Sequence, residues 1–251
     1  MYALKLRFRD AVVWKYSIVA ISKIIEEANF KATSDGIKLR AMDPSAVVLV
    51  DFYIPSSAFY EYDISGDVVI GLNMEELAKM LRRARKGDEL VLEVLPGGRI
   101  GISLEGRGFR RFVLSSIELS YEEPPEISFE ETFTGKILPK LFKDVIKELE
   151  PISDTIEFYA PPDEGKLILR AESEIAEAQI ELSSASGALI EYTSTSEAKS
   201  KYTLDYFVDI VAASQVAETL SLGFGVETPI RLTYELPLGG KLEFYVAPRT
   251  D

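Results

Sequence analysis

The chain has 251 residues, of which 41 are acidic and 28 basic, giving a formal net charge of −13 at pH 7. It contains no cysteine and no histidine, which excludes disulfides, thiol nucleophiles, the usual zinc sites and the commonest general base. No apolar run reaches the roughly 18 residues that span a bilayer, so we expect no membrane partner. We also expect no metal and no cofactor. The negative charge also argues at first against nucleic acid, whose phosphates bind basic surfaces.

The first ten residues alternate apolar and charged side chains, which predicts a strand and not a signal peptide and favours a cytosolic-type compartment. Apolar spacings of three and four predict helices over roughly 11–28, 73–86, 139–150 and 205–217. Many short strands are predicted between them. The clearest, in chain order, are 36–41, 47–54, 90–95, 99–104, 109–114, 155–159, 166–171, 176–182, 219–224, 230–236 and 241–246.

The two halves of the chain repeat each other. The strand that begins at Gly36 is echoed by one that begins at Gly165, and Asn73 and Asp205 occupy the same expected N-cap position before a helix. The simplest account is a duplicated domain. Between the copies, Pro124 and Pro125 follow paired acids and cannot continue a central strand. We therefore predict an N-terminal domain over 1–117, an exposed connector over 118–131 and a C-terminal domain over 132–251.

Positive charge is concentrated on the predicted helix 73–86. Lys79, Arg82, Arg83 and Lys86 are spaced as one helical face. A weaker basic stripe is predicted on helix 139–150, whereas helix 205–217 carries only acids. Basic helices gathered on one surface of an acidic protein would bind phosphates locally and without reading bases. The alternative is an ordinary solvated helix face.

Two other classes of protein remain open. A carboxylate enzyme such as a glycosidase would need two acids in a sugar cleft, but no acid pair lies in an aromatic-rich context and the only tryptophan, Trp14, falls in a helix. A β-rich adhesion or structural protein would account for the strands. It would not account for the basic helix.

Three motifs carry a family resemblance. Residues 39–51 (LRAMDPSAVVLVD), 224–230 (FGVETPI) and 239–249 (GGKLEFYVAPR) resemble, in order and spacing, the proliferating cell nuclear antigen family of DNA sliding clamps, in its archaeal form. The resemblance implies an α+β fold of duplicated clamp domains, with β-sheets outside and four helices lining a toroidal trimer. It implies a non-enzymatic processivity factor for replication and repair, located with the archaeal nucleoid in the cytoplasm, or in the nucleus of a eukaryote.

The resemblance also implies partners and surfaces. The chain would encircle duplex DNA regardless of sequence, together with two further clamp subunits in a homotrimer or in a heterotrimer whose members prefer different partners. By analogy with the family, the DNA-facing residues are Lys15, Lys79, Arg82, Arg83, Lys86, Lys140, Lys143 and Lys147.

Clamp loader, DNA polymerase, ligase and flap endonuclease would bind through short apolar-aromatic peptides that enter a pocket beside the connector. The residues at the matching positions are Met42, Ala46, Val47, Leu49, Pro124, Pro125, Pro229, Tyr245, Ala247 and Pro248. Ala46 stands where the family often has a larger side chain. Subunits would meet head to tail through the strand with Phe109, Arg110, Arg111 and Phe112 and the segment with Ile175, Ala176 and Ala178.

Overall fold

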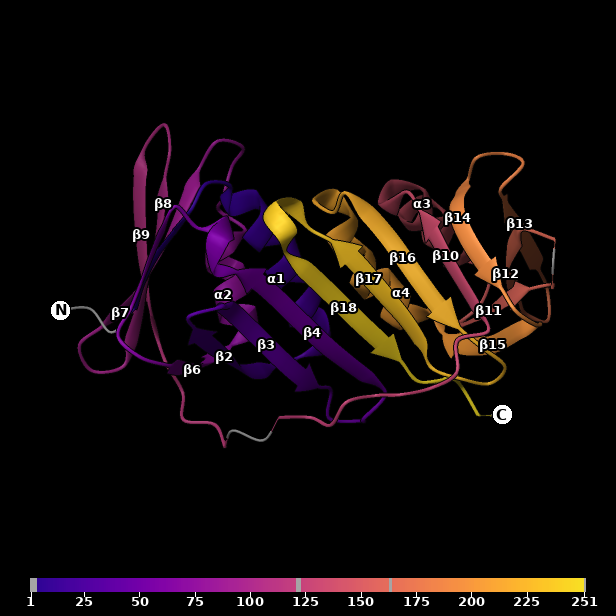
Figure 1. Ribbon diagram of the computed structural model, residues 1–251, viewed down its shortest axis with the longest axis horizontal. Coiled ribbons are helices and arrows are strands. Elements are labelled where there is room, and N and C mark those ends of the chain that lie inside the picture. Colours follow the sequence, from indigo (N-terminus) through magenta and orange to yellow (C-terminus); the bar gives the residue numbers. More distant parts are fainter. Residues whose placement is uncertain (1–3, 121–122, 163, 251) are drawn as a thin grey trace. The chain divides into compact units, whose positions relative to one another are not determined.

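The computed structural model describes residues 4–120, 123–162 and 164–250 (Figure 1). Tyr121 and Glu122 of the predicted connector, and residues 1–3 of the predicted first strand, lie outside the described residues. In the part of the chain that is described, no helix is long and apolar enough to cross a membrane.

The chain divides into two compact units. The first comprises Met1–Pro44, Val50–Pro124 and Leu236–Leu242, and the second Ser45–Leu49, Pro125–Glu235 and Glu243–Asp251. The first half of the chain contains β1 (Leu4–Phe8), α1 (Ala11–Ile24), β2 (Glu27–Thr33), β3 (Gly36–Met42), β4 (Val48–Pro55), β5 (Glu61–Ile64), β6 (Val68–Asn73), α2 (Met74–Leu81), β7 (Glu89–Leu95), β8 (Arg99–Glu105) and β9 (Phe109–Ser115).

The second half contains β10 (Phe133–Ile137), α3 (Pro139–Leu149), β11 (Thr155–Ala160), β12 (Lys166–Glu172), β13 (Glu177–Ser183), β14 (Leu189–Ser194), β15 (Ala198–Thr203), α4 (Leu204–Ile210), β16 (Thr219–Phe224), β17 (Ile230–Glu235) and β18 (Lys241–Val246). A 3-10 helix, η2 (Val211–Gln215), continues from α4.

Strand order confirms the predicted duplication. Neighbouring strands run β5-β1-β7-β8-β9 and β4-β3-β2-β6 in the first half, and β14-β10-β16-β17-β18 and β13-β12-β11-β15 in the second. The two sets correspond strand by strand, and each helix follows the equivalent strand in its own half. The predicted α+β fold of two repeated copies is therefore present in the chain.

Three of the predicted helices, the first, the second and the fourth, are too long. The first ends at Ile24, because from Ala28 onward buried residues alternate with half-buried ones and the chain forms β2. The second ends at Leu81. Ala84 keeps the helical spacing and is buried, but it lies in a tight turn in which its N–H donates to the carbonyl of Leu81. The apolar spacing alone could not separate that turn from a further helical turn.

The two predicted N-caps have different outcomes. Asn73 caps α2, with its side-chain oxygen accepting from the N–H of Glu76 at 3.0 Å. The prediction for Asp205 is wrong, since α4 begins one residue earlier at Leu204 and Thr203 holds the cap position. The N–H of Leu204 is instead satisfied by the carbonyl of Asp154 at 2.8 Å. Helix α4 stops at Ile210, and η2 covers part of the remaining predicted span.

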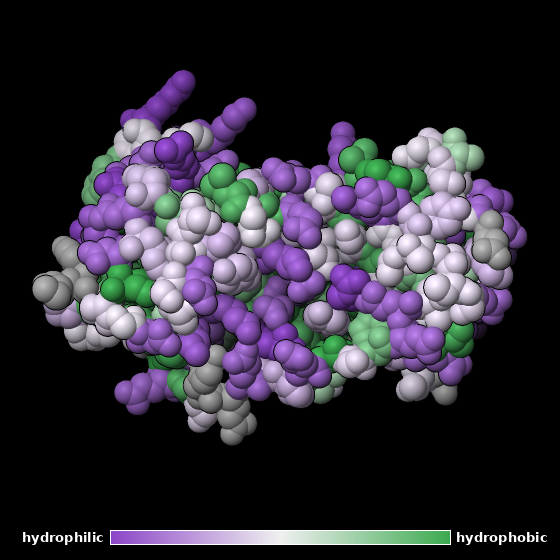
Figure 2. Space-filling model, viewed as in Figure 1, coloured by the Kyte–Doolittle hydropathy of each residue, from purple (hydrophilic) through white to green (hydrophobic). Residues whose placement is uncertain are grey.

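Aromatic clusters form the core of each unit. In the first, Trp14 on α1 is buried and its ring meets those of Phe8, Phe52 and Phe59 edge-on. In the second, the buried ring of Phe158 is the centre of an equivalent cluster. Trp14 is thus a packing residue and not part of a sugar cleft. On the face shown in Figure 2, hydrophobic residues form small groups among hydrophilic ones.

Candidate nucleic-acid and protein interfaces

Helix α2 presents its predicted cations to solvent already paired with acids. The Nζ atom of Lys79 lies 2.6 Å from a carboxylate oxygen of Glu76, and the guanidinium of Arg82 donates to Glu75 at 3.0 and 3.4 Å. The hydrogen bond to Glu76 raises the pKa of Lys79, and the one from Arg82 lowers the pKa of Glu75. These two cations are therefore partly neutralised by their own helix.

The remaining cations of this region lie in the turn after α2 and not on the helix. Arg83 and Lys86 are exposed there. The turn is fixed by the buried Asp88, whose carboxylate accepts from the N–H of Arg85 at 2.6 Å and from the guanidinium of Arg110 at 2.5 Å. Arg110 also donates to the carbonyl of Arg83 at 2.7 Å. One carboxylate thus organises a loop that is otherwise strongly basic.

Replacement of Asp88 by Asn is expected to lower the free energy of unfolding at pH 7 by about 2 kcal/mol, because charge-assisted hydrogen bonds to a buried carboxylate are lost. Burial by itself raises the pKa of Asp88, but the bonds from Arg85 and Arg110 outweigh it and the pKa is lowered. A carboxyl whose pKa is lower in the folded than in the unfolded chain stabilises the fold at pH values above the pKa of the unfolded chain. That stability is lost as pH falls below about 4.

Denaturant unfolding at pH 7 and pH 3 tests this prediction for Asp88→Asn. The deficit should shrink at the lower pH, because protonation of this carboxyl in the unfolded chain removes part of the stability that the lowered pKa provides. Asp67→Asn, at an exposed position, is the control and should match wild type at both pH values. An equal deficit at the two pH values would show that the carboxylate charge is not what stabilises the turn.

The other predicted DNA-facing residues are distributed over α1 and α3. Lys15 on α1 is half-buried, and its Nζ donates to the carbonyl of Ala84 at 3.1 Å. On α3, Lys140 and Lys147 are exposed and Lys143 is half-buried, opposite the face that packs in the core. Within the described residues these three lysines form no ion pair. Their charge is therefore less offset than that of Lys79 and Arg82.

Eight of the ten predicted pocket residues belong to the second unit, whereas Met42 and Pro124 belong to the first. The carbonyl of Val47 accepts from the N–H of Ala247 at 2.8 Å, so the segment before β4 and the segment after β18 lie side by side. Val47, Ala247, Pro248 and Pro229 are half-buried, and Met42 is also half-buried. Such partly exposed apolar residues can accept an apolar side chain from a partner.

The other predicted pocket residues differ in exposure. Leu49 is only 1% exposed and belongs to the core. Ala46 is exposed, with a left-handed φ of 56°, while Pro124 is half-buried and Pro125 exposed. Tyr245 on β18 is half-buried and contacts the ring of Phe129 edge-on, with 6.5 Å between centroids. Phe129 was not predicted, although an aromatic residue within an acidic linker was the signal for it.

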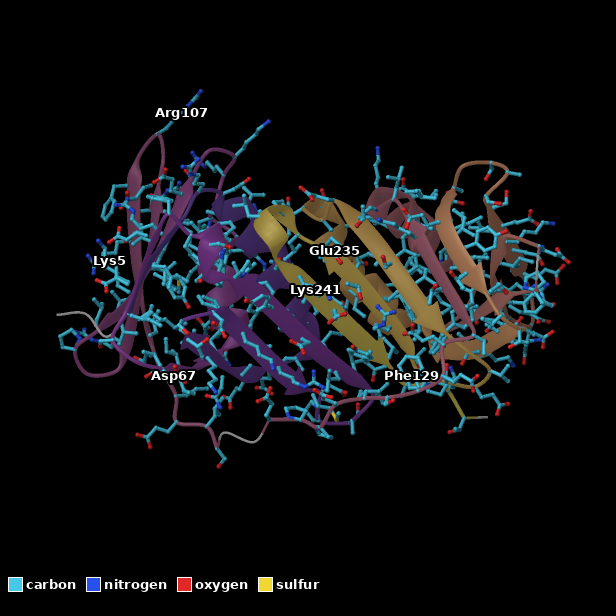
Figure 3. All side chains as sticks on the ribbon, in the orientation of Figure 1. Lys5, Asp67, Arg107, Phe129, Glu235 and Lys241 are labelled. Carbon is cyan, nitrogen blue, oxygen red and sulfur yellow. The ribbon has the colours of Figure 1, made fainter. Side chains whose placement is uncertain are left out.

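Strand β9 is an edge strand among the described residues and pairs only with β8, for example Phe112 with Ile102. Phe109 is 64% exposed and Arg111 is also exposed, while Arg110 and Phe112 are half-buried. Arg111 pairs with Glu93 at 3.0 Å, and Arg107 extends from the tip of the β8–β9 hairpin (Figure 3). This edge combines exposed apolar side chains with basic ones.

Strand β13 is the edge of another sheet and pairs with β12 alone in the described structure. Ile175, just before the strand, is 96% exposed, and Ala176 and Ala178 are half-buried. The charged residues along this edge are acidic: Glu174, Glu177 and Glu181. Both edges offer unpaired backbone groups and exposed apolar side chains, and their charges are opposite in sign.

Comparison with known proteins decides the family. Residues 3–95 match the model of the proliferating cell nuclear antigen N-terminal domain. DNA polymerase sliding clamp 3 of Aeropyrum pernix is 41% identical over 245 residues, which cover 97% of each chain. The chain belongs to the sliding clamp family. DNA polymerase sliding clamp 3 of Sulfurisphaera tokodaii is 35% identical over 99% of this chain and 100% of its own length.

A solved clamp structure agrees with this assignment. A chain from the crystal structure of the PCNA2–PCNA3 complex of Sulfolobus tokodaii superimposes with a TM-score of 0.92 at 35% identity, covering 98% of this chain and 100% of its own. The predictions of an archaeal-type sliding clamp, its fold and its role as a processivity factor at DNA are confirmed. The clamp family is non-catalytic, and its members work with further clamp subunits and with DNA polymerase.

Proposed function

We propose that this clamp closes a three-subunit ring head to tail through β9 and β13, with the cations of α1, α2, α3 and the loop after α2 facing duplex DNA. The pair of sheet edges supports the ring best, because each is exposed, partly apolar and opposite in charge to the other. Encirclement makes weak phosphate contacts sufficient, since the ring slides without dissociating. We infer that the protein has no catalytic role of its own and acts in the cytoplasm of an archaeal cell.

Topology provides the test of encirclement. Clamp loaded onto a nicked circular plasmid by a clamp loader should remain on the DNA during gel filtration. It should be lost once the plasmid is cut to a linear form, because a ring can slide off free ends. Equal retention on circular and linear DNA would exclude encirclement and indicate ordinary binding.

The composition of the ring follows from the same edges. A basic β9 and an acidic β13 on one chain make a second copy a suitable neighbour. A mixed ring is favoured by a different observation, the complex of two distinct clamp chains in Sulfolobus tokodaii. The mass of the purified protein distinguishes the two: a homotrimer gives three times 28.0 kDa on its own, and a heterotrimer gives that mass only with sister subunits.

The proposed domain organisation is one clamp domain over residues 1–117, a second over residues 132–251, and the connector over residues 118–131. Partners such as polymerase, ligase and flap endonuclease would insert an apolar-aromatic peptide between the connector and the surface around Val47, Tyr245, Ala247 and Pro248. The contact between Val47 and Ala247 and the contact between Phe129 and Tyr245 support this location.

Replacement of Val47 by Glu is expected to weaken binding of such a peptide at least about tenfold, because a charge would be left unpaired in an apolar contact. Fluorescence anisotropy with a labelled partner peptide measures this, and stimulation of a polymerase should fall in parallel. Ile190→Glu, at an exposed apolar position of the same unit, is the control. Leu49 is unsuitable as a probe because it is core. Normal peptide binding by Val47→Glu would place the pocket elsewhere.

A further inference from the structure

The C-terminal end of the connector is fixed by Arg231 of β17. Its guanidinium grips the carboxylate of Glu131 with two bonds, from Nε at 2.7 Å and from Nη2 at 2.8 Å. The third nitrogen, Nη1, donates to the hydroxyl of Thr233 at 2.9 Å, and that hydroxyl donates to Glu243 at 2.8 Å. The connector is thus tied through a side-chain network to β17 and β18.

The local backbone leaves room for this grip. A Cβ atom at Gly223 of β16 would lie 2.4 Å from the carboxyl carbon of Glu131, so any larger residue there would displace the carboxylate. Only two residues before Glu131, the ring of Phe129 contacts Tyr245, a predicted pocket residue two positions after Glu243. The grip and the proposed pocket therefore share the same strand, β18.

A second arginine holds the connector at an earlier point, within the first unit. The Nε atom of Arg40 on β3 donates to the carbonyl of Pro124 at 3.1 Å, and its Nη1 donates to Asp51 at 2.5 Å. The neighbouring Lys38 pairs with Glu123 at 2.6 Å. Asp51 orients the nearly buried guanidinium, which leaves its Nε directed at the connector backbone.

We propose that Arg231 and Arg40 are positioning residues that fix residues 125–130 of the connector before a partner arrives, and so determine how tightly the partner peptide binds. The inference rests on the pocket proposed above. Neither guanidinium needs to touch the peptide. Each acts by removing conformations of the connector that could not form the rim of the pocket.

The physical reason is preorganisation. A peptide that pairs alongside a mobile loop must order that loop as it binds, and the ordering weakens the affinity. A loop already fixed at both ends has lost most of that freedom on folding. Arginine suits this role because its planar fork makes two parallel bonds to one carboxylate, whereas lysine offers a single point charge.

The absence of cysteine allows a direct measurement of connector order. In the full-length, assembled protein, Ser128→Cys, at an exposed position, carries a single nitroxide per subunit. Arg231→Gln and Arg40→Gln should each make the nitroxide more mobile. The same substitutions without the label should weaken a polymerase-derived apolar-aromatic peptide about tenfold, which corresponds to roughly 1.4 kcal/mol. Arg231→Lys should give an intermediate loss.

Arg7→Gln is the matched control, because Arg7 has the same 26% side-chain exposure as Arg231 and is also paired with a glutamate, yet lies on β1. It should change neither mobility nor affinity. Unchanged nitroxide mobility in Arg231→Gln and Arg40→Gln would overturn the proposed positioning role. Increased mobility with unchanged peptide affinity would overturn its link to partner binding. If wild type binds no peptide, the pocket assignment fails, and nitroxide mobility still decides whether the arginines fix the connector.

Discussion

Replacement of Phe109 by Asp is expected to convert the ring into subunits of 28.0 kDa. Phe109 is the most exposed large apolar residue of β9, and a strand added along this edge would cover its ring. Loss of a buried aromatic anchor costs about 2 kcal/mol or more at an interface, and an unpaired carboxylate in its place adds a further desolvation cost. In a ring of three identical subunits the same loss occurs at every subunit interface, so the effect on assembly is large.

Light scattering after gel filtration measures the mass, and the free energy of unfolding of the isolated subunit should stay close to that of wild type. Val69→Asp is the matched control, because Val69 is 49% exposed and lies on β6, the edge strand of another sheet. A ring that persists in Phe109→Asp at micromolar concentration would place the subunit contact away from β9.

The opposite charges of β9 and β13 give a related expectation for a homotrimer. Arg111→Glu should weaken assembly, and an acid-to-base change at Glu177 in the same chain should restore part of it.

Much of the fold could be predicted from the sequence because strands and helices have different periods. The strand predictions at 219–224 and 241–246 coincide with β16 and β18. Buried residues alternate with half-buried ones along β18 and along the first four residues of β16. Helix ends were harder to place. At the end of α2 the buried Ala84 continues the helical spacing, while Asp88, whose side chain fixes the turn that follows, lies further along the chain.

The candidate surfaces could be predicted only as far as local spacing reaches. The pairing of Lys79 with Glu76 is an i, i+3 contact that the sequence contains. The grip of Arg231 on Glu131 joins residues 100 positions apart, and a single sequence carries no signal for it. The burial of Leu49 also depends on distant neighbours. The family motif places Leu49 with the pocket residues, whereas the structure shows that it belongs to the core. Such distant contacts depend on which strands become neighbours.

Replacement of Lys79, Arg82 and Arg83 together by Ala is expected to weaken the hold on DNA and to reduce its dependence on salt, while the ring stays intact. Each lost phosphate contact lowers the slope of log affinity against log salt by about 0.9. The residence time on circular DNA across a salt series measures this. Lys166→Ala with Lys199→Ala is the control, because both lysines lie on strands, β12 and β15, instead of the proposed DNA-facing helices, and are also paired with glutamates.

The ion pairs of α2 predict a change of opposite sign. Glu75→Gln with Glu76→Gln releases Arg82 and Lys79 from their partners, so affinity and salt slope should both rise if these cations face phosphate. The lysines of α3 have no such partners within the described residues. Replacing one of them by Ala should therefore lower the affinity for DNA more than replacing Lys79 or Arg82. If neither the basic triple variant nor the acid-to-amide variant alters the salt slope, the charges of α2 only solvate the helix and the DNA-facing surface lies elsewhere.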